Sequence, residues 1–83
     1  MRYKLYTYDL WGNDKDGYQI NDYYEQSDIY EVIDPDNDSD LISMIDFTNP
    51  ESIEINHSES CNDYIYFQTH AGKPVCELRR IDQ

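Results

Sequence analysis

The carboxylates of segment 34–40 are the residues whose spacing most directly suggests chemistry. Aspartate occupies every second position: Asp34, Asp36, Asp38 and Asp40. Alternating side-chain oxygens are what a calcium-binding loop supplies at its first positions. Such a loop also needs a glycine at its sharp turn and a bidentate glutamate at its end, where this chain has Ser39 and Ile45. The segment therefore fits a solvated turn leading into a helix better than a specific Ca²⁺ site, and a weak calcium-binding module is an alternative function.

A second acidic pattern overlaps this segment. An acid recurs at every third residue, at Asp22, Glu25, Asp28, Glu31 and Asp34, and no Lys or Arg lies between Lys15 and Lys73. Carboxylates at alternate positions of a strand are ~6.6 Å apart. Successive phosphates of one DNA strand rise ~3.4 Å along the helix axis and lie further apart than that in space. A row of exposed carboxylates can therefore approximate a phosphate track and occupy the basic groove of a nucleic-acid-binding protein.

The overall charge sets limits on the partner. The chain has 18 Asp and Glu against 6 Lys and Arg, a formal net charge of -12. Direct binding to nucleic acid or to an anionic membrane is disfavoured, because both need a basic footprint. Solubility needs a charge of magnitude only ~2–8, so the excess points to an electrostatic role. Nine tyrosines among the 83 residues favour a folded domain over a disordered acidic chain.

Residues that usually carry catalysis form no constellation here. Cys61 and Cys76 fit no zinc, haem or redox spacing, and His57 and His70 have no ligand at metal spacing. Carboxylates are abundant, and nothing selects two of them as acid and base. We therefore expect no enzymatic activity, no cofactor and no metal centre. The pattern of two unpaired thiols, without a leader or an apolar run of ~20 residues, predicts a cytoplasmic protein of the host cell.

The elements that position these residues follow from periodicity. Residues 3–11 and 18–24 are rich in β-favouring side chains and flank a glycine-containing turn at 12–17, which predicts a hairpin over 2–24. A third short strand is expected over 28–33, with Ile29 and Ile33 on one face.

A short helix is expected after Pro35. Ser39 or Asp38 can cap it, and Asp40 lies in the first turn, where the helix dipole favours negative charge. The segment 49–50 (NP) ends it. One stripe of the helix is apolar: Leu41, Ile42, Met44 and Ile45.

The chain closes with a strand and a hairpin. Residues 52–57 alternate, with Ile53, Ile55 and His57 on one face. Residues 63–81 predict a hairpin around a two-residue turn at 71–72. If His70 faces Lys73, four pairs follow: Phe67 with Cys76 and Ile65 with Leu78 on one face, Tyr66 with Glu77 and Tyr64 with Arg79 on the other, the guanidinium lying over the Tyr64 ring.

Together these elements predict a single α+β domain over residues 1–83. Its sheet is mostly antiparallel, with about five to six short strands and one short helix in the order β-β-β-α-β-β-β. If the first and last strands are neighbours, the basic residues at the two ends of the chain cluster and the acids take the remaining surface.

The two ends of the sequence also resemble a known group of proteins. Residues 6–13 (YTYDLWGN) and 16–22 (DGYQIND), with residues 72–80 (GKPVCELRR), are similar to patterns in small acidic proteins of phages, plasmids and other mobile elements. The resemblance implies a setting in which such proteins serve as inhibitors of host defence, including anti-CRISPR and anti-restriction proteins. It implies no established activity or site.

Charge pattern and resemblance together lead to one expected function. We expect an acidic, nucleic-acid-mimicking inhibitor that binds a basic nucleic-acid-binding surface of a host defence complex such as a CRISPR effector. The expected partner-binding acids are Asp22, Glu25, Asp28, Glu31, Asp34, Asp36, Asp38 and Asp40, with Tyr23, Tyr24 and Tyr30 as anchors. The alternative to inhibition is a generic accessory interaction domain of a mobile element, for which a dimer through an exposed edge strand is one form.

Overall fold

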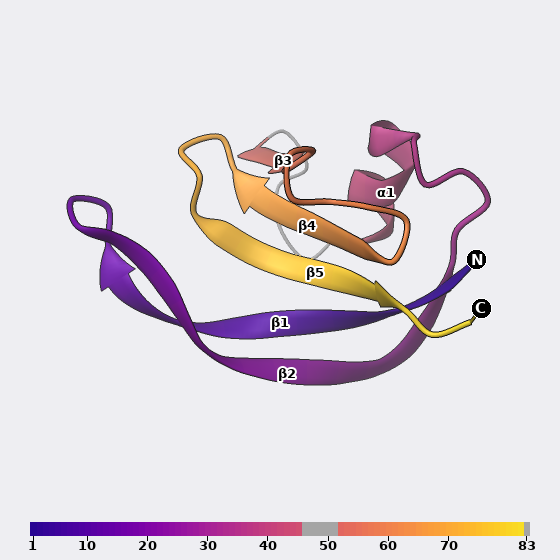
Figure 1. The fold of residues 1–83 in the computed structure, drawn as a ribbon, viewed down its shortest axis with the longest axis horizontal. Coiled ribbons are helices and arrows are strands. Elements are labelled where there is room, and N and C mark those ends of the chain that lie inside the picture. The colour runs from indigo at the N-terminus through magenta and orange to yellow at the C-terminus, as the bar shows by residue number, and fades with distance from the viewer. Residues whose placement is uncertain (46–51, 83) are drawn as a thin grey trace.

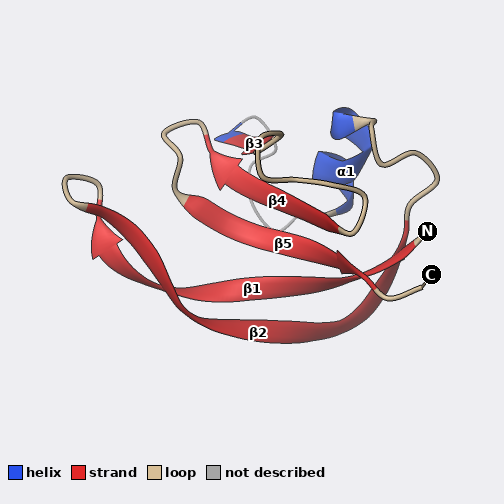
Figure 2. Cartoon of the chain, in the orientation of Figure 1, coloured by secondary structure: helices blue, strands red, loops and turns tan. Residues whose placement is uncertain are grey.

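The computed structural model describes residues 1–45 and 52–82. These residues form a five-stranded antiparallel sheet and one α-helix packed against one of its faces (Figures 1 and 2). The elements are β1 (Arg2–Asn13), β2 (Gly17–Glu31), α1 (Asp38–Met44), β3 (Ile53–Ile55), β4 (Tyr64–Thr69) and β5 (Pro74–Arg80). The strand order is β2-β1-β5-β4-β3, so the first and last strands are neighbours. Within the described residues, no helix is long and apolar enough to cross a membrane.

The predicted order of elements is wrong at the third strand. An antiparallel sheet with one short helix is present, but residues 28–31 continue β2, so the described order is β-β-α-β-β-β. Between the pairs Tyr6↔Glu25 and Lys4↔Ile29, β2 has three residues where β1 has one. This irregularity accommodates the polar residues 26–28 without ending the ladder, as β-bulges do.

The β1–β2 hairpin projects beyond the rest of the sheet (Figure 1). β1 pairs with β5 from Tyr3 to Thr7, and in the described structure the remainder of β1 pairs with β2 alone. Residues 8–13 and 17–23 therefore form a two-stranded arm. Its tip is closed by Asn13, whose side-chain oxygen accepts hydrogen bonds from the backbone N–H groups of Lys15 and Asp16 at 3.0 and 2.8 Å.

The core lies between the sheet and α1. Strand residues of alternating sequence position supply most of it: Tyr3, Leu5, Ile53, Ile55, Ile65, Phe67, Cys76 and Leu78. The predicted helix stripe is confirmed, because Leu41 and Ile45 are buried and Ile42 and Met44 pack against the core. The predicted N-cap is wrong by one or two positions. The cap is Asn37, whose side chain accepts from the Asp40 N–H at 3.2 Å.

The register predicted for the last hairpin is confirmed, but its turn is longer than predicted. All four predicted pairs are present in β4 and β5. Thr69 accepts the Gly72 N–H and donates to the Lys73 carbonyl, both at 2.9 Å, and Gly72 has φ +92°. This is a type I turn followed by a glycine bulge, one of the common longer hairpin loops, and it places Gln68 opposite Pro74.

The predicted strand over 52–57 is shorter in the structure. β3 ends at Ile55, and His57 lies outside it and is exposed. Asn56 begins a turn, because its side-chain oxygen accepts from the Ser58 hydroxyl at 2.7 Å and from the Glu59 N–H at 3.3 Å. Ile53 and Ile55 are buried as predicted.

Candidate protein-binding surface

The predicted acids of β2 are exposed on the edge of the sheet: Asp22, Glu25, Asp28 and Glu31. They do not share one face. Glu25 lies opposite Tyr6, on the face that α1 leaves open, whereas Asp22 lies opposite Asp9 on the other face. Strand side chains alternate with a period of two, so acids three residues apart change face unless a bulge intervenes. The irregularity at 26–28 adds two residues to β2 and leaves the alternation of faces unchanged, so Glu31, six residues after Glu25, lies opposite Arg2 on the open face as well.

The acids of segment 34–40 support a turn and a helix start. The Asp34 side chain accepts from the Asp36 N–H at 3.0 Å. The carboxylate of Asp38 lies 2.6 Å from Nε2 of His57. Across residues 1–45 and 52–82, no three His, Cys, Asp or Glu side chains are grouped so that they could share a metal ion. This geometry matches the turn leading into a helix that the sequence predicts, with Asn37 in place of Ser39 or Asp38 as the cap.

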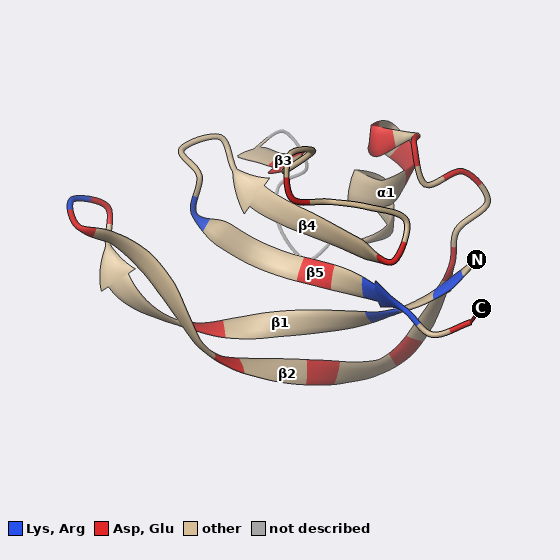
Figure 3. Ribbon diagram, in the orientation of Figure 1, with Lys and Arg blue, Asp and Glu red and all other residues tan. Residues whose placement is uncertain are grey.

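Acidic and basic residues are unevenly distributed over the molecule, although Lys15 lies between Asp14 and Asp16 in the turn of the arm (Figure 3). Acids follow β2 and continue through segment 34–40 into α1. Four basic residues gather where β1 and β5 adjoin near the termini: Arg2, Lys4, Arg79 and Arg80. Of the eight predicted acids, Glu31 and Asp38 are the two that form ion pairs with a described residue, Glu31 with Arg2 at 3.9 Å. The acidic edge therefore stays largely uncompensated.

The three predicted tyrosine anchors have different surroundings. Tyr24 is 50% exposed. Tyr23 is 45% exposed and meets the Tyr8 ring edge-on, with ring centroids 5.5 Å apart. Tyr30 is half-buried and packs against the core. Tyr23 and Tyr24 thus remain accessible to a partner, whereas Tyr30 has a structural contact.

The open face of the sheet carries a cluster of tyrosines around Glu77 and Arg79. Glu77 is buried, and its carboxylate accepts from the Tyr8 hydroxyl at 3.1 Å and from Nε of Arg79 at 2.6 Å. Burial and then the Glu77 charge raise the pKa of Tyr8. The hydrogen bond that Arg79 donates to Glu77 is the main cause of the raised pKa of Arg79.

The predicted stacking of Arg79 on Tyr64 is wrong. Its guanidinium lies over Tyr6 at 4.1 Å and over Tyr23 at 4.9 Å. The sequence could not show this, because the contact depends on β1 lying between β2 and β5. The available signal was spacing. Tyr6 and Tyr8 are two positions apart in one strand and Glu77 and Arg79 are two positions apart in another, which predicts that the members of each pair share a face.

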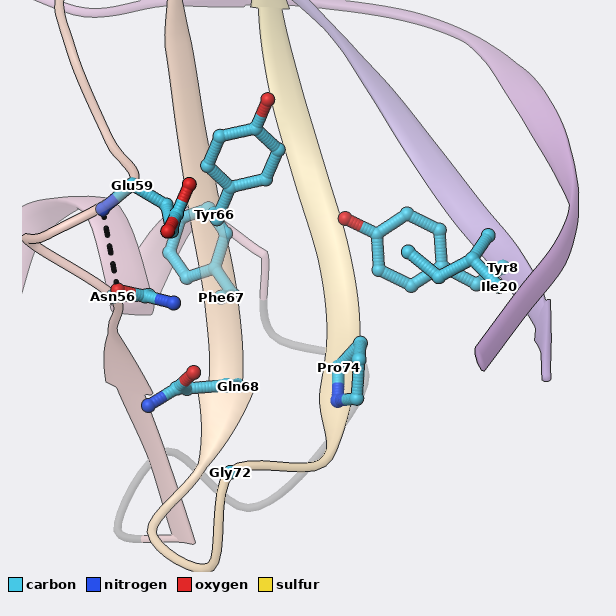
Figure 4. A pocket seen from close by; sticks show the side chains of 9 residues that line it. All are labelled: Tyr8, Ile20, Asn56, Glu59, Tyr66, Phe67, Gln68, Gly72 and Pro74. Atoms are coloured by element: carbon cyan, nitrogen blue, oxygen red, sulfur yellow. Dashed lines mark hydrogen bonds between the residues drawn. The ribbon is translucent and has the colours of Figure 1, made fainter. Parts of the chain in front are cut away.

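A hollow of about 220 Å³ adjoins this tyrosine cluster (Figure 4). Tyr8 and Ile20, from the arm, form one side of it. Tyr66 and Gln68, from β4, form the other, and Pro74 of β5 lies between them. The sequence did not indicate this hollow, since its walls come from five separate segments of the chain.

The sequence analysis did not identify two exposed apolar residues as candidates for binding. Trp11 is 60% exposed on the projecting arm, and Ile33 is 96% exposed beside the acids of segment 34–40. Ile33 was expected on a strand face with Ile29, but β2 ends at Glu31. Large exposed side chains next to charged ones are typical of protein-binding surfaces.

Comparison with protein-family models, curated proteins and solved structures finds no match to this chain. Its function must therefore be inferred from the chemistry of its own residues.

Proposed function

We propose that this protein is an acidic inhibitor that binds a basic nucleic-acid-binding surface of a host defence complex, such as a CRISPR effector, in the cytoplasm of the host cell. One observation carries the proposal: exposed acids run along the edge strand β2 and on through segment 34–40, and most of them have no basic partner among the described residues. The binding residues are the eight acids, with Tyr23 and Tyr24 as aromatic contacts.

The energetics of charge favour such a partner. A net charge of -12 on a domain of this size destabilises the compact state by self-repulsion. A basic groove would relieve that repulsion, and it would also attract the acidic surface at long range and speed association. The protein itself would then exclude DNA or RNA from the groove. The resemblance of the chain ends to small proteins of mobile elements supports host defence as the setting.

The partner can be sought by affinity capture from host lysate at low and high salt. We expect a nucleic-acid-binding protein at low salt and its loss at high salt, because exposed charge pairs are screened. The triple variant D28N/D36N/D40N removes three acids of the proposed surface that have no ion pair with a described residue and should weaken capture. The matched variant D9N/D14N/D16N removes the same charge from the arm and should have less effect. Capture that is indifferent to salt, or equal losses in the two variants, would contradict the proposal.

A second candidate function is a generic accessory interaction domain, in which the acids serve only solubility. The exposure of Trp11 and Ile33 favours it. In this case the double variant W11A/I33A would abolish partner binding, and D28N/D36N/D40N would leave it intact. The two candidates therefore predict opposite responses from the same pair of variants.

A further inference from the structure

The hollow beside the tyrosine cluster has the size of a site for one side chain. Its volume is about 220 Å³, below the ~300–1,000 Å³ typical of small-molecule sites. Its apolar and aromatic lining residues are Tyr8, Ile20, Tyr66, Phe67 and Pro74. An occupant must therefore offer a long apolar stem or a flat group that fits between these side chains.

The aromatic walls are held in place by their neighbours. The Tyr8 hydroxyl donates to Glu77, and the Tyr8 ring contacts the Tyr23 ring at 5.5 Å with an interplanar angle of 84°. Tyr66 stacks on Tyr64, with ring centroids 6.3 Å apart and an interplanar angle of 7°. Because both rings are fixed without a ligand, an occupant would not have to order them.

The hollow is suited to a cation. None of its described lining residues is Lys or Arg, and Glu59 lies at its rim on the same side as Tyr66 (Figure 4). Glu59 is exposed, and its backbone is fixed by the hydrogen bond to Asn56. No described residue lies in an ion pair with the Glu59 carboxylate. An aromatic surface beside a free carboxylate attracts a cationic side chain through both ring and charge.

The chain already holds one guanidinium on this face in the same manner. Arg79 lies over Tyr6 at 4.1 Å while its Nε donates to Glu77 at 2.6 Å. A tyrosine ring and a glutamate therefore bind an arginine here, and the hollow repeats that combination with Tyr66 and Glu59. Arginine suits it better than lysine, because the planar guanidinium stacks on a ring and forms a forked pair with a carboxylate.

We propose that this hollow receives an arginine side chain from a protein partner. Its stem lies along Pro74 and Ile20, and its guanidinium contacts the Tyr66 ring and the Glu59 carboxylate. None of the eight acids of the proposed function lines the hollow. The site therefore goes beyond that function and can bind arginine whether or not the acids meet a nucleic-acid-binding surface.

The proposal can be tested with a peptide and the full chain. The probe is acetyl-Gly-Arg-Gly-amide, titrated into the isotope-labelled protein and followed by NMR amide shifts. We expect shifts centred on Tyr8, Ile20, Tyr66 and Gln68. The citrulline peptide, which is neutral and nearly isosteric, should bind at least about fivefold more weakly, because it keeps the shape and loses the charge. The lysine peptide should also bind more weakly.

Two variants locate the binding site. Glu59→Gln removes the carboxylate at the rim and should weaken arginine-peptide binding by about fivefold. Asp28→Asn removes the same charge from β2 and should leave it unchanged, which separates the hollow from the acidic edge. Any of three results would overturn the proposal. The first is amide shifts spread equally over segment 34–40, and the second is that the citrulline or the lysine peptide binds as tightly as the arginine peptide. The third is that the two variants have equal effects on binding.

Discussion

Val32 and Ile33 are adjacent apolar residues with opposite surroundings. Val32 is 2% exposed in the core, whereas Ile33 is 96% exposed. We expect Val32→Ala to lower the free energy of unfolding by about 2 kcal/mol, because it removes two buried methyl groups and leaves a cavity. Ile33→Ala should change it by less than about 0.5 kcal/mol. Urea denaturation of both variants measures the difference, and equal effects would mean that this part of the chain is packed differently.

The buried Cys76 thiol and the half-buried Tyr8 phenol predict a loss of stability in alkali. Burial raises the pKa of Cys76 to about 12 from 9.0, and burial followed by the Glu77 charge raises that of Tyr8 above 10.0. Both folded-state values exceed the unfolded ones. Their contribution is therefore complete below about pH 9 and falls as the pH rises further, because the unfolded chain releases these protons first.

The alkaline loss from Cys76 should approach roughly 1 kcal/mol per pH unit above its ordinary pKa, and the half-buried Tyr8 should add less because solvent screens it. Urea midpoints measured from pH 7 to pH 11 give the profile. Tyr8→Phe has no phenol to titrate at this position and should show a shallower decrease than the unaltered protein. A midpoint that stays constant to pH 11 would show that Cys76 and Tyr8 are not protected from solvent.

At the scale of the elements, the turn of the β1–β2 arm depends on Gly12. This residue has φ +115°, and a Cβ placed on it would lie 2.1 Å from the Gly17 carbonyl oxygen. Gly17 also has a positive φ, +90°, but a Cβ there would meet open space. We expect Gly17→Ala to cost about 1 kcal/mol from its backbone conformation and Gly12→Ala to cost more, since the backbone must also move.

Hydrogen exchange of the arm amides gives the most direct measurement of this effect. Gly12→Ala should lower protection in residues 8–13 and 17–23 more than Gly17→Ala does, while β4 and β5 keep their protection. Equal protection in the two variants would contradict the close approach of Gly12 to Gly17.

The sequence predicted the elements whose signals are local. The register of β4 and β5 was predicted because it pairs like residues on each face: apolar Phe67 with Cys76 on one face, and polar or aromatic Tyr66 with Glu77 on the other. The separate third strand was wrong, because residues 26–28 have the composition of a turn. Their continuation in β2 is decided by pairing with Arg2 to Lys4, which are more than twenty positions away in the chain.

The candidate sites depend still more on distant contacts. The residue spacing identified the acids and tyrosines but could not assign their faces, since a one-residue bulge, as at Asn21 of β2, reverses every side chain that follows it. Tyr30 was expected as an anchor and packs on the core. The hollow forms because the β1–β5 and β4–β5 pairings bring Tyr8 near Pro74 and Tyr66. No local pattern in the sequence predicts the β1–β5 pairing.

At the scale of the whole molecule, the net charge of -12 should make stability depend on salt. Exposed acids repel one another over about 30 Å at 0.01 M salt and over much shorter distances at higher salt. We expect the free energy of unfolding to rise by on the order of 1 kcal/mol between about 0.01 M and 0.5 M NaCl. The variant D28N/D36N/D40N should show a smaller rise. Urea midpoints across this range measure it, and a midpoint that falls with salt would mean that attractive pairs outweigh the repulsion.

One competition measurement tests whether the acidic edge displaces nucleic acid, as the proposed function requires. The host protein captured at low salt is purified, and its binding of labelled DNA or RNA is followed while this protein is added at several salt concentrations. Competition for a basic groove predicts full displacement of the nucleic acid, with an apparent affinity that falls as salt rises. A complex that holds this protein and the nucleic acid together, or displacement that is indifferent to salt, would contradict the account.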